Sequence, residues 1–314
     1  MNVLISGVAG DIGVGIVRIL KEWGIFGKLH GIDVNPNHYA SLFLDVCAES
    51  PKANDKDYLR WLTEYILEHK INLFIPTSEA ELSVLAETDA LKIGDANVLM
   101  NSKFIVQTCL DKFDCLEYLS LRGVAVPKYG LLGHHVPDDF PVIVKPRSGQ
   151  GGKGVLCVNT PQEFEKISNA NLLWQTYLQP DDEEYTCAIF VSKAAITNKL
   201  VMRRKLVGGL TGSGEVVANP IIDEYLCSIV KTLNLTGALN IQLRLTSEGA
   251  RLFEINPRLS STVVFRDVMG FQDLRWWASD VLGLGISFEI SLPEEGTRFF
   301  RGSREYIFAN YSRD

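Results

Sequence analysis

Four oxygen-bearing side chains stand at alternating positions in two apolar segments of the chain. The segments read GALNIQLRL and RLFEINPR. If each is a β-strand, alternate side chains share a face, so Asn240 and Gln242 lie together on the first strand. Glu254 and Asn256 likewise share a face of the second strand. An oxygen-only patch with one carboxylate suits Mg²⁺, which often completes its octahedron with phosphates and water.

The residues between these segments predict that the two strands form one hairpin. The tripeptide SEG at 247–249 suits a three-residue loop with glycine at the left-handed third position. A loop centred on its middle residue pairs Gln242 with Glu254, and Asn240 with Asn256, with Cβ atoms about 4.5–5.5 Å apart. The opposite face is then filled by Ile241, Leu243, Phe253 and Ile255. A half-exposed polar sheet face that meets only water is the alternative interpretation.

Cations and glycines that suit phosphate binding lie upstream of this hairpin. Lys145 ends an apolar strand, where a buried ammonium would be costly without an anion, although a strand-end lysine can also reach water. The loop GQGGKG at 149–154 exposes backbone N–H groups to phosphate oxygens and can close over a nucleotide. Arg203, Arg204 and Lys205 precede a second glycine-rich loop. They add phosphate-seeking charge, with Arg204 as a candidate nucleotide ligand, or else form a solvated strand edge.

The N-terminal glycines support a rival hypothesis. The segment GVAGDIGVG has glycines at positions 7, 10, 13 and 15, and Asp33 follows Gly13 by twenty residues. This pattern resembles a dinucleotide fingerprint, so an NAD(P)-dependent oxidoreductase or epimerase is the alternative function. The chain has no Tyr-x-x-x-Lys pair of the short-chain reductase kind. We therefore expect the glycine turn to pack tightly or to help hold an acceptor substrate.

A candidate substrate site follows the third predicted strand. Ligands in open α/β sheets bind along the carboxyl edge of the strands, and that edge carries Thr77, Ser78 and Glu79. The alternative is that these residues only cap a helix. Three later arginines are further candidates for a substrate carboxylate, although a solvated surface is the favoured interpretation for each: Arg266, Arg275 and Arg301.

Alternating strands and helices must position these groups. Over the first hundred residues the pattern predicts a parallel sheet covered by helices, with strands NVLIS, KLHGIDV, INLFIPT and NVLM and helices at 12–23, 58–69 and 79–87. Later strands are FPVIVKP, VLCV, LLWQTYL and those between 185 and 207. Later helices are expected at 102–122, 221–233 and 265–282.

Bulk composition narrows the class of protein. The 314 residues are 46% hydrophobic and 22% charged, which is an ordinary globular profile. A net charge of −7 without a long basic run argues against a general nucleic-acid or membrane-surface binder. We expect neither a signal peptide nor a membrane span. The six cysteines form no CxxC pair, which favours reduced thiols in a cytoplasmic protein.

Taken together, these residues resemble the ATP-grasp superfamily, and most closely its branch that is similar to the carbamoyl-phosphate synthetase large subunit. The resemblance runs from about Ser102 to Gly270. It rests on the order and spacing of the motifs DKF, GVAVPKYG, FPVIVKPRSGQGGKGV, WQTYL with EEYT, NIQ, and FEINPRLSS.

The resemblance implies a role for each matching position. Lys112 and Lys145 correspond to the cations that hold the ATP phosphates. Glu184 corresponds to the ribose-binding glutamate, with Glu183 as its rival because the preceding linker is longer than usual. Arg258 corresponds to the arginine that steadies a transferred phosphate or an acyl-phosphate. Lys145 and Arg258 are therefore the expected catalytic residues.

Three further sets of positions follow from the resemblance. The loop that folds over the phosphates includes Gly149, Gly151 and Gly152. The hinge that reads adenine comprises Gln175, Thr176, Tyr177 and Leu178. The implied Mg²⁺ ligands are Gln242, Glu254 and Asn256. Gln175 stands where many members have a glutamate, so its contact with the adenine amino group stays open.

The implied fold is α/β with an α+β lid. It comprises a Rossmann-like domain at 1–100, a linker helix and lid at 101–184, and a C-terminal part with the metal site at 185–314. The implied enzyme is an ADP-forming ligase that joins a small-molecule carboxylate to an amine, or a related nucleophile, through an acyl-phosphate. Its cofactors are ATP and Mg²⁺ or Mn²⁺, and a homodimer is a possible assembly. A non-catalytic nucleotide-binding relative is the last alternative.

Overall fold

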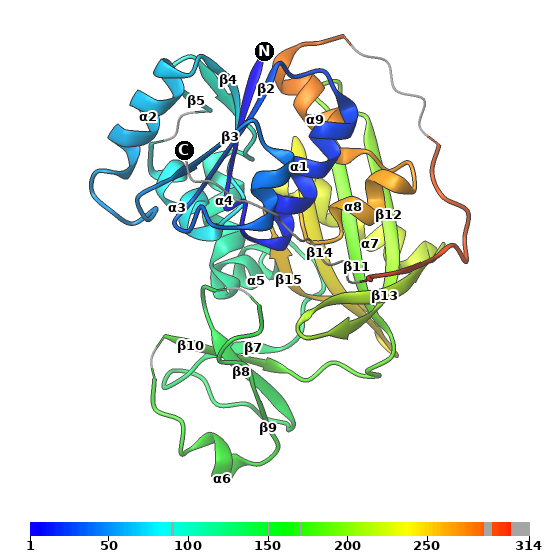
Figure 1. Cartoon of the computed structure of the whole chain (residues 1–314). Coiled ribbons are helices and arrows are strands. Elements are labelled where there is room, and N and C mark those ends of the chain that lie inside the picture. Colours follow the sequence, from blue (N-terminus) through cyan, green and yellow to red (C-terminus); the bar gives the residue numbers. More distant parts are fainter. Residues whose placement is uncertain (89–90, 150, 170, 286–290, 303–314) are drawn as a thin grey trace.

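The computed structural model of the protein describes residues 1–88, 91–149, 151–169, 171–285 and 291–302. This part of the chain forms three β-sheets with helices packed against them (Figure 1). The N-terminal sheet has the order β3-β2-β1-β4-β6-β5, and only its β5–β6 pair is antiparallel. Its strands are β1 (Asn2–Ser6), β2 (Lys28–Asp33), β3 (Val46–Glu49), β4 (Ile71–Ile75), β5 (Lys92–Ile93) and β6 (Ala96–Val98).

Helices cover both faces of the N-terminal sheet. The helical elements here are α1 (Asp11–Trp23), η1 (Tyr39–Phe43), α2 (Tyr58–Glu68) and α3 (Glu79–Thr88). Val3 and Ile5 of β1 pack with α1, whereas Leu4 between them packs with α2 and α3. This alternation is what a parallel strand buried on both sides requires, and it confirms the Rossmann-like expectation.

The second sheet forms a small lid, which lies at the bottom of Figure 1. Its order is β7-β10-β8-β9, and every pair is antiparallel. The lid consists of β7 (Tyr129–Leu131), β8 (Val142–Pro146), β9 (Leu156–Val158), α6 (Pro161–Phe164) and β10 (Leu172–Thr176). Two helices precede it: α4 (Lys103–Leu110) and α5 (Lys112–Ser120).

The C-terminal sheet has the order β15-β14-β11-β12-β13-β16 and is antiparallel throughout. Its strands are β11 (Glu184–Val191), β12 (Thr197–Val207), β13 (Leu210–Val216), β14 (Gly237–Thr246), β15 (Gly249–Asn256) and β16 (Arg298–Phe300). The helices of this part are α7 (Pro220–Leu233), α8 (Val263–Val268) and α9 (Asp273–Leu282).

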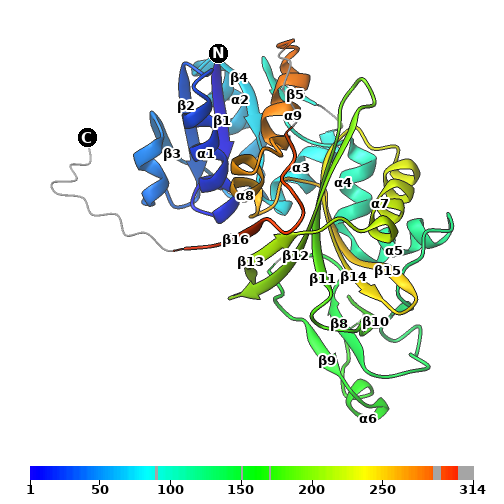
Figure 2. The same cartoon turned by 90° about the vertical axis from the view of Figure 1, so that its right-hand side faces the viewer.

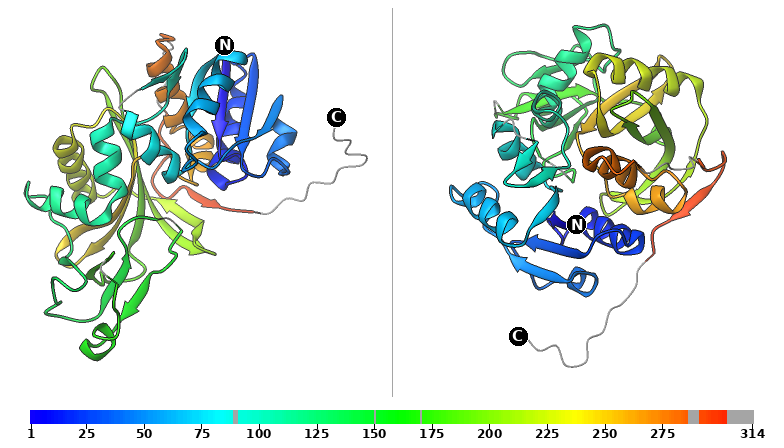
Figure 3. Two further views of the ribbon diagram at one scale, coloured as in Figure 1. Left: turned by 90° about the vertical axis from the view of Figure 1, so that its left-hand side faces the viewer. Right: turned by 90° about the horizontal axis from the view of Figure 1, so that it is seen from above.

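The two faces of the C-terminal sheet have different coverings. Helix α7 lies on one face, and α8 and α9 lie on the other with the N-terminal sheet and α1 beyond them (Figures 2 and 3). On β11, Cys187 and Ile189 pack toward α7, while Ala188 and Phe190 pack toward α1 and α9. A single apolar core therefore joins the N-terminal sheet to the C-terminal sheet.

The predicted pairing within the β14–β15 hairpin is confirmed. Gln242 lies opposite Glu254, and Asn240 opposite Asn256. The turn differs from the predicted three-residue loop, because Thr246 pairs with Gly249 and leaves a turn of two residues.

A β-bulge next to Gln242 restores the register, so the predicted orientation of Phe253 on β15 is wrong. Leu252, not Phe253, fills the core face, and Phe253 lines a cavity beside Glu254. A bulge leaves one extra residue in one strand and reverses the alternation on one side of it.

Two helices that the periodicity predicts as continuous are each broken in two. The helix expected at 102–122 stops at Asp111, whose carboxylate caps α5 by accepting from the N–H groups of Phe113 and Asp114 at 2.9 and 3.2 Å. The helix expected at 265–282 is interrupted at Gly270, which has a φ of +92°. A Cβ there would lie 2.1 Å from the carbonyl oxygen of Ser291, so only glycine fits.

The N-terminal glycines serve close packing. A Cβ on Gly13 would lie 2.3 Å from the carbonyl oxygen of Gly7, and one on Gly15 would lie 3.0 Å from methyl groups of Val263 and Val264. Asp33 accepts a hydrogen bond of 2.9 Å from the N–H of Ala9 in the glycine turn. In a dinucleotide fingerprint this acidic residue binds the ribose instead, so these contacts favour the packing interpretation.

Candidate nucleotide-binding site

A cavity of about 320 Å³ lies between the lid and the C-terminal sheet. Its volume is in the range of small-molecule sites. The predicted site residues among its lining are Lys112, Lys145, Gly149, Gly151, Gly152, Gln175, Tyr177, Leu178, Glu184, Arg204, Gln242 and Glu254. The lining also contains Lys153 and Arg244, so five cations face two carboxylates among the described residues. This excess of positive charge suits a polyphosphate.

The two predicted phosphate-binding lysines meet at Glu254. Lys145 is 6% exposed, and its Nζ donates to the carbonyl oxygen of Phe253 at 2.7 Å. Burial lowers the pKa of Lys145 to about 8, against the opposing effect of the Glu254 charge. The Nζ of Lys112 lies 3.3 Å from Oε1 of Glu254 and donates to the carbonyl oxygen of Gly149 at 2.6 Å. Lys112 therefore connects the glycine loop to the C-terminal sheet.

Glu184 is held between two arginines. Arg204 donates to its Oε1 from Nε and Nη2 at 3.0 and 2.9 Å, and Arg244 donates to its Oε2 from Nη2 at 3.1 Å. Glu184 and Arg244 are direct partners across β11 and β14. Glu183 faces elsewhere and pairs with Arg203 at 3.2 Å. Of the two rival glutamates, Glu184 is the one that lines the cavity.

Arg244 is a residue that the sequence analysis missed. Its Nη1 donates to the carbonyl oxygen of Leu178 and to Asp181, and its guanidinium carbon lies 5.3 Å from the centre of the Tyr177 ring. Arg244 thus connects the predicted hinge to Glu184. The signal available in the sequence was its place two residues after Gln242, which puts both side chains on the same face of β14.

The donors of the predicted metal site fit Mg²⁺ in their chemistry. Gln242 and Glu254 are opposed in the hairpin and both line the cavity, where they offer an amide oxygen and a carboxylate. Oε1 of Gln242 accepts from Arg204 at 2.9 Å, and Glu254 pairs with Lys112. Asn256 is buried on the same strand but is not part of the cavity lining. Of the three predicted ligands, Gln242 and Glu254 are therefore the two that line the cavity.

Within the described ranges, no group of three or more His, Cys, Asp or Glu side chains is arranged to hold a metal ion. The predicted metal site has one carboxylate and two amides, so it is not a group of this kind. This composition also agrees with the expectation of Mg²⁺ over zinc, which prefers His and Cys.

The predicted hinge divides between the cavity and the sheet. Gln175 lies opposite Ile143 on β8, and both line the cavity. Its Oε1 is buried and has no hydrogen-bond partner in the part of the chain that the structure describes. Thr176 is not part of the cavity lining, and its N–H donates to the carbonyl oxygen of Lys128 at 2.9 Å. Gln175 thus offers a buried polar atom to a ligand.

Arg258 is not among the residues that line the cavity; it lies four residues after Glu254, where it contacts Glu79 beside the N-terminal sheet. It is 8% exposed, and its Nη2 lies 3.2 Å from Oε1 of Glu79. The hydroxyl groups of the other two predicted substrate residues have structural partners: Thr77 donates to the carbonyl oxygen of Ser6 at 2.9 Å, and Ser78 donates to Glu81 at 3.0 Å. Ser78 also accepts from the N–H of Glu81, as the helix-cap alternative predicts.

The favoured interpretation of two later arginines as solvated surface is wrong. Arg266 is 1% exposed and pairs with Asp273 at 2.8 Å. The side chain of Arg275 is 13% exposed and pairs with Asp267 at 2.7 Å. Arg301 is exposed, as expected. Charges inside a protein require such partners, and the partners lie beyond the helix break at Gly270.

An antiparallel lid and an antiparallel six-stranded sheet enclose the cationic cavity, and a Rossmann-like sheet precedes them in the chain; together they form the ATP-grasp fold. Residues 109–262 match the model of a family described as an ATP-grasp domain. The expected fold class is thereby confirmed.

A sequence relative also matches part of the chain. The chain is 29% identical over 193 residues to the carbamoyl phosphate synthase large chain of Thermotoga petrophila, a match that covers 54% of this chain and 18% of that protein. The chain therefore spans less than a fifth of the length of this relative.

Solved structures with the same fold include two ligases. The N5-carboxyaminoimidazole synthetase of Staphylococcus aureus, complexed with ADP, has a TM-score of 0.73 and 17% identity over 93% of this chain and 79% of its own. The L-amino acid ligase of Bacillus licheniformis has a TM-score of 0.70 and 16% identity over 89% of this chain and 74% of its own. None of the described helices is long and apolar enough to cross a bilayer.

Proposed function

We propose that the protein is an ATP-dependent ligase that activates a small-molecule carboxylate as an acyl-phosphate and transfers it to an amine or a related nucleophile. ADP and phosphate are the other products. The observation that carries this proposal is the cavity between the lid and the C-terminal sheet, in which five cations surround Glu184 and Glu254. The oxidoreductase alternative has no comparable support, because Asp33 is engaged with the glycine turn.

In the proposed reaction the chain acts mainly by binding and electrostatics. Lys112 and Lys145 hold the phosphates, and the N–H groups of the glycine loop at 149 and 151–154 close over them. Arg258 neutralises charge on the transferred phosphate once its pairing with Glu79 gives way to the substrate. Mg²⁺ or Mn²⁺, when held by Glu254 with Gln242 and Asn256, would neutralise further charge on the phosphates.

The base and the sugar would bind at the other end of the cavity. Glu184 binds the ribose hydroxyls, and Gln175 reads the edge of the base beside the backbone of Tyr177 and Leu178. Arg204 lies between Glu184 and Gln242, where it can meet a phosphate oxygen. In this arrangement the nucleotide runs from Gln175 to Glu254.

The decisive experiment is a screen of acid and amine pairs for release of ADP and phosphate, with the ligated product identified by mass spectrometry. Glu254→Gln should abolish turnover. Glu248→Gln is the matched control, because its side chain is 80% exposed at the turn of the same hairpin. Release of AMP would refute the acyl-phosphate route, and full activity of the Glu254 variant would refute the site.

We also propose a cytoplasmic protein whose partners are small molecules, with a homodimer as a possible assembly. The location is supported by the six cysteines, all of which are free. The mass of the particle in solution, measured by light scattering, tests the homodimer: a mass near 35 kDa would exclude it, because the chain has a mass of 35.0 kDa.

A further inference from the structure

The loop at 257–262, which follows β15 and carries Arg258, is buried except at the half-buried Ser261, although it has no regular secondary structure. The exposed fractions are 8% for Arg258, 4% for Leu259, 7% for Ser260 and 1% for Thr262. Loops usually lie on the surface because their polar groups need water. The polar groups of this loop must therefore be satisfied by other parts of the protein.

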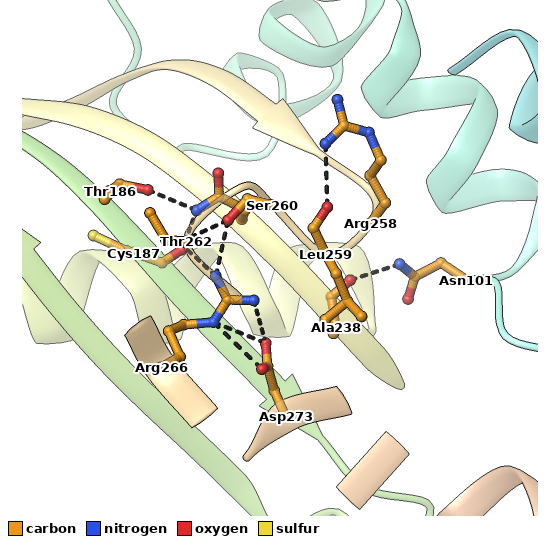
Figure 4. Close-up of polar contacts among 11 residues, drawn as sticks. Asn101, Thr186, Cys187, Ala238, Arg258, Leu259, Ser260, Thr262, Arg266 and Asp273 are labelled. Carbon is orange, nitrogen blue, oxygen red and sulfur yellow. Dashed lines mark hydrogen bonds and ion pairs between the residues drawn. The ribbon is translucent and has the colours of Figure 1, made fainter. Parts of the chain in front are cut away.

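Arg266 of α8 is the side chain that satisfies two of them. Its Nη1 donates to Oγ of Ser260 at 2.8 Å and to Oγ1 of Thr262 at 2.5 Å, and these two hydroxyl oxygens are 2.8 Å apart (Figure 4). The remaining donors of Arg266 reach Asp273 at the start of α9, from Nε at 3.1 Å and from Nη2 at 2.8 Å. Arg266 thus connects the loop to a second helix.

The geometry of this loop determines where Arg258 can point. The Nη1 of Arg258 donates to the carbonyl oxygen of Leu259 at 3.1 Å, one residue before the contact of Arg266 with Ser260. In Figure 4 Arg266 reaches the loop from one side while Arg258 extends from the other. A shift of Ser260 would move the carbonyl group that orients the Arg258 guanidinium.

We propose that Arg266, together with Asp273, is a positioning residue of the ligase: it fixes the loop at 257–262 so that Arg258 meets the terminal phosphate of the nucleotide. The proposal rests on the proposed function. Burial leaves the Arg266–Asp273 ion pair little freedom to move, because both residues are 1% exposed. Loss of either partner leaves an unpaired charge in the interior, so the pair cannot shift without moving the loop.

A neighbouring ion pair provides a matched control. Arg275 of α9 donates to Asp267 of α8 at 2.8 and 2.7 Å, so this pair joins the same two helices. Its hydrogen bonds end on the helices and do not extend to Ser260 or Thr262. Asp267→Asn therefore disturbs the contact between α8 and α9 without removing a contact of the loop.

The test compares the affinities for AMP-PNP and ADP, each with Mg²⁺, by calorimetry. The wild type should prefer the triphosphate analogue, and Arg258→Ala should lower that preference about tenfold or more. Asp273→Asn should lower it similarly while keeping the ADP affinity within about twofold. The double variant Ser260→Ala with Thr262→Val keeps the ion pair and should act in the same way. Asp267→Asn should lower the Tm and leave the preference unchanged.

Different outcomes overturn different statements. An unchanged preference in Asp273→Asn and in the double variant would overturn the proposal, as would an unchanged preference in Arg258→Ala. Loss of preference in Asp267→Asn as well would reduce Arg266 to a general structural role. Failure of the wild type to bind either nucleotide would overturn the proposed function itself, and the proposal with it.

Discussion

We predict that replacing Lys145, the buried lysine of the cavity, makes the ligand-free protein more stable. Burial lowers the pKa of Lys145 from its ordinary value of 10.5 to about 8. The difference of 2.5 (10.5 − 8) corresponds to about 3 kcal/mol at 1.36 kcal/mol per pKa unit. Lys145→Met removes this cost at pH 7 but leaves the carbonyl group of Phe253 without its donor, which costs about 1 kcal/mol. We expect a net gain of about 2 kcal/mol.

The gain should depend on pH in a defined direction. Below pH 8 Lys145 is charged in both the folded and the unfolded protein, so the cost of burial is fully present. Between pH 8 and 10.5 the folded protein releases its proton first, and the stability of the wild type relative to the variant rises by about 1.4 kcal/mol per pH unit. The advantage of Lys145→Met should therefore vanish near about pH 9.5.

Urea unfolding at pH 7, 8, 9 and 9.5, without nucleotide and with a chelator, measures these differences. Lys153→Met is the control, because Lys153 lines the same cavity but is exposed. Its free energy of unfolding should equal that of the wild type at every pH. A Lys145→Met variant that is less stable at pH 7, by an amount that does not change with pH, would refute the reasoning. The same variant should no longer bind ATP.

Three further substitutions test the cavity and its support. Gln175→Glu should raise the ratio of ATP affinity to ITP affinity about tenfold. A carboxylate accepts a hydrogen bond from the 6-amino group of ATP, whereas an amide can also donate one to the 6-oxo group of ITP. An unchanged ratio in calorimetry would mean that Gln175 does not read the base. Arg244→Met should weaken ATP binding about tenfold. Arg251→Met on the same hairpin should not, because it loses a pairing with the exposed Glu248 and a hydrogen bond to the carbonyl oxygen of Ala250, and neither contact reaches the cavity. Gly15→Ala should lower the free energy of unfolding by about 1–3 kcal/mol because its Cβ would press on Val263 and Val264, and an equal loss for Gly10→Ser, at the N-cap of α1, would contradict this packing argument.

Local spacing predicted the part of the site that lies within one hairpin or one loop. The pairing of Gln242 with Glu254 follows from the period of a strand and a short turn. The glycine loop and Lys145 adjoin one another in the sequence, and both line the cavity. The bulge that turns Phe253 toward the cavity leaves no mark in the residue types, so its orientation was missed.

Contacts between distant segments were beyond such reasoning. Arg244 reaches Glu184 because β11 and β14 pair across 60 residues of sequence, and no periodicity reports that register. Arg266 looks like a surface residue because a charged side chain in an amphipathic helix normally faces water. Its partner Asp273 becomes its neighbour only because the chain turns at Gly270.

Because the apolar core is divided, we expect two parts of the molecule to open separately, one more readily than the other. Val3 of the N-terminal sheet shares one buried cluster with Phe190 and Trp276, so both large sheets should exchange their amide hydrogens in one slow class. Among the described residues the lid has a separate, smaller buried cluster, and the lid should exchange earlier. Its members are Leu132, Val142, Val144, Val158, Phe164 and Trp174. One wall of the nucleotide cavity thus belongs to the slow unit and the other to the fast unit. A nucleotide that contacts both walls would bring the lid into the slow class.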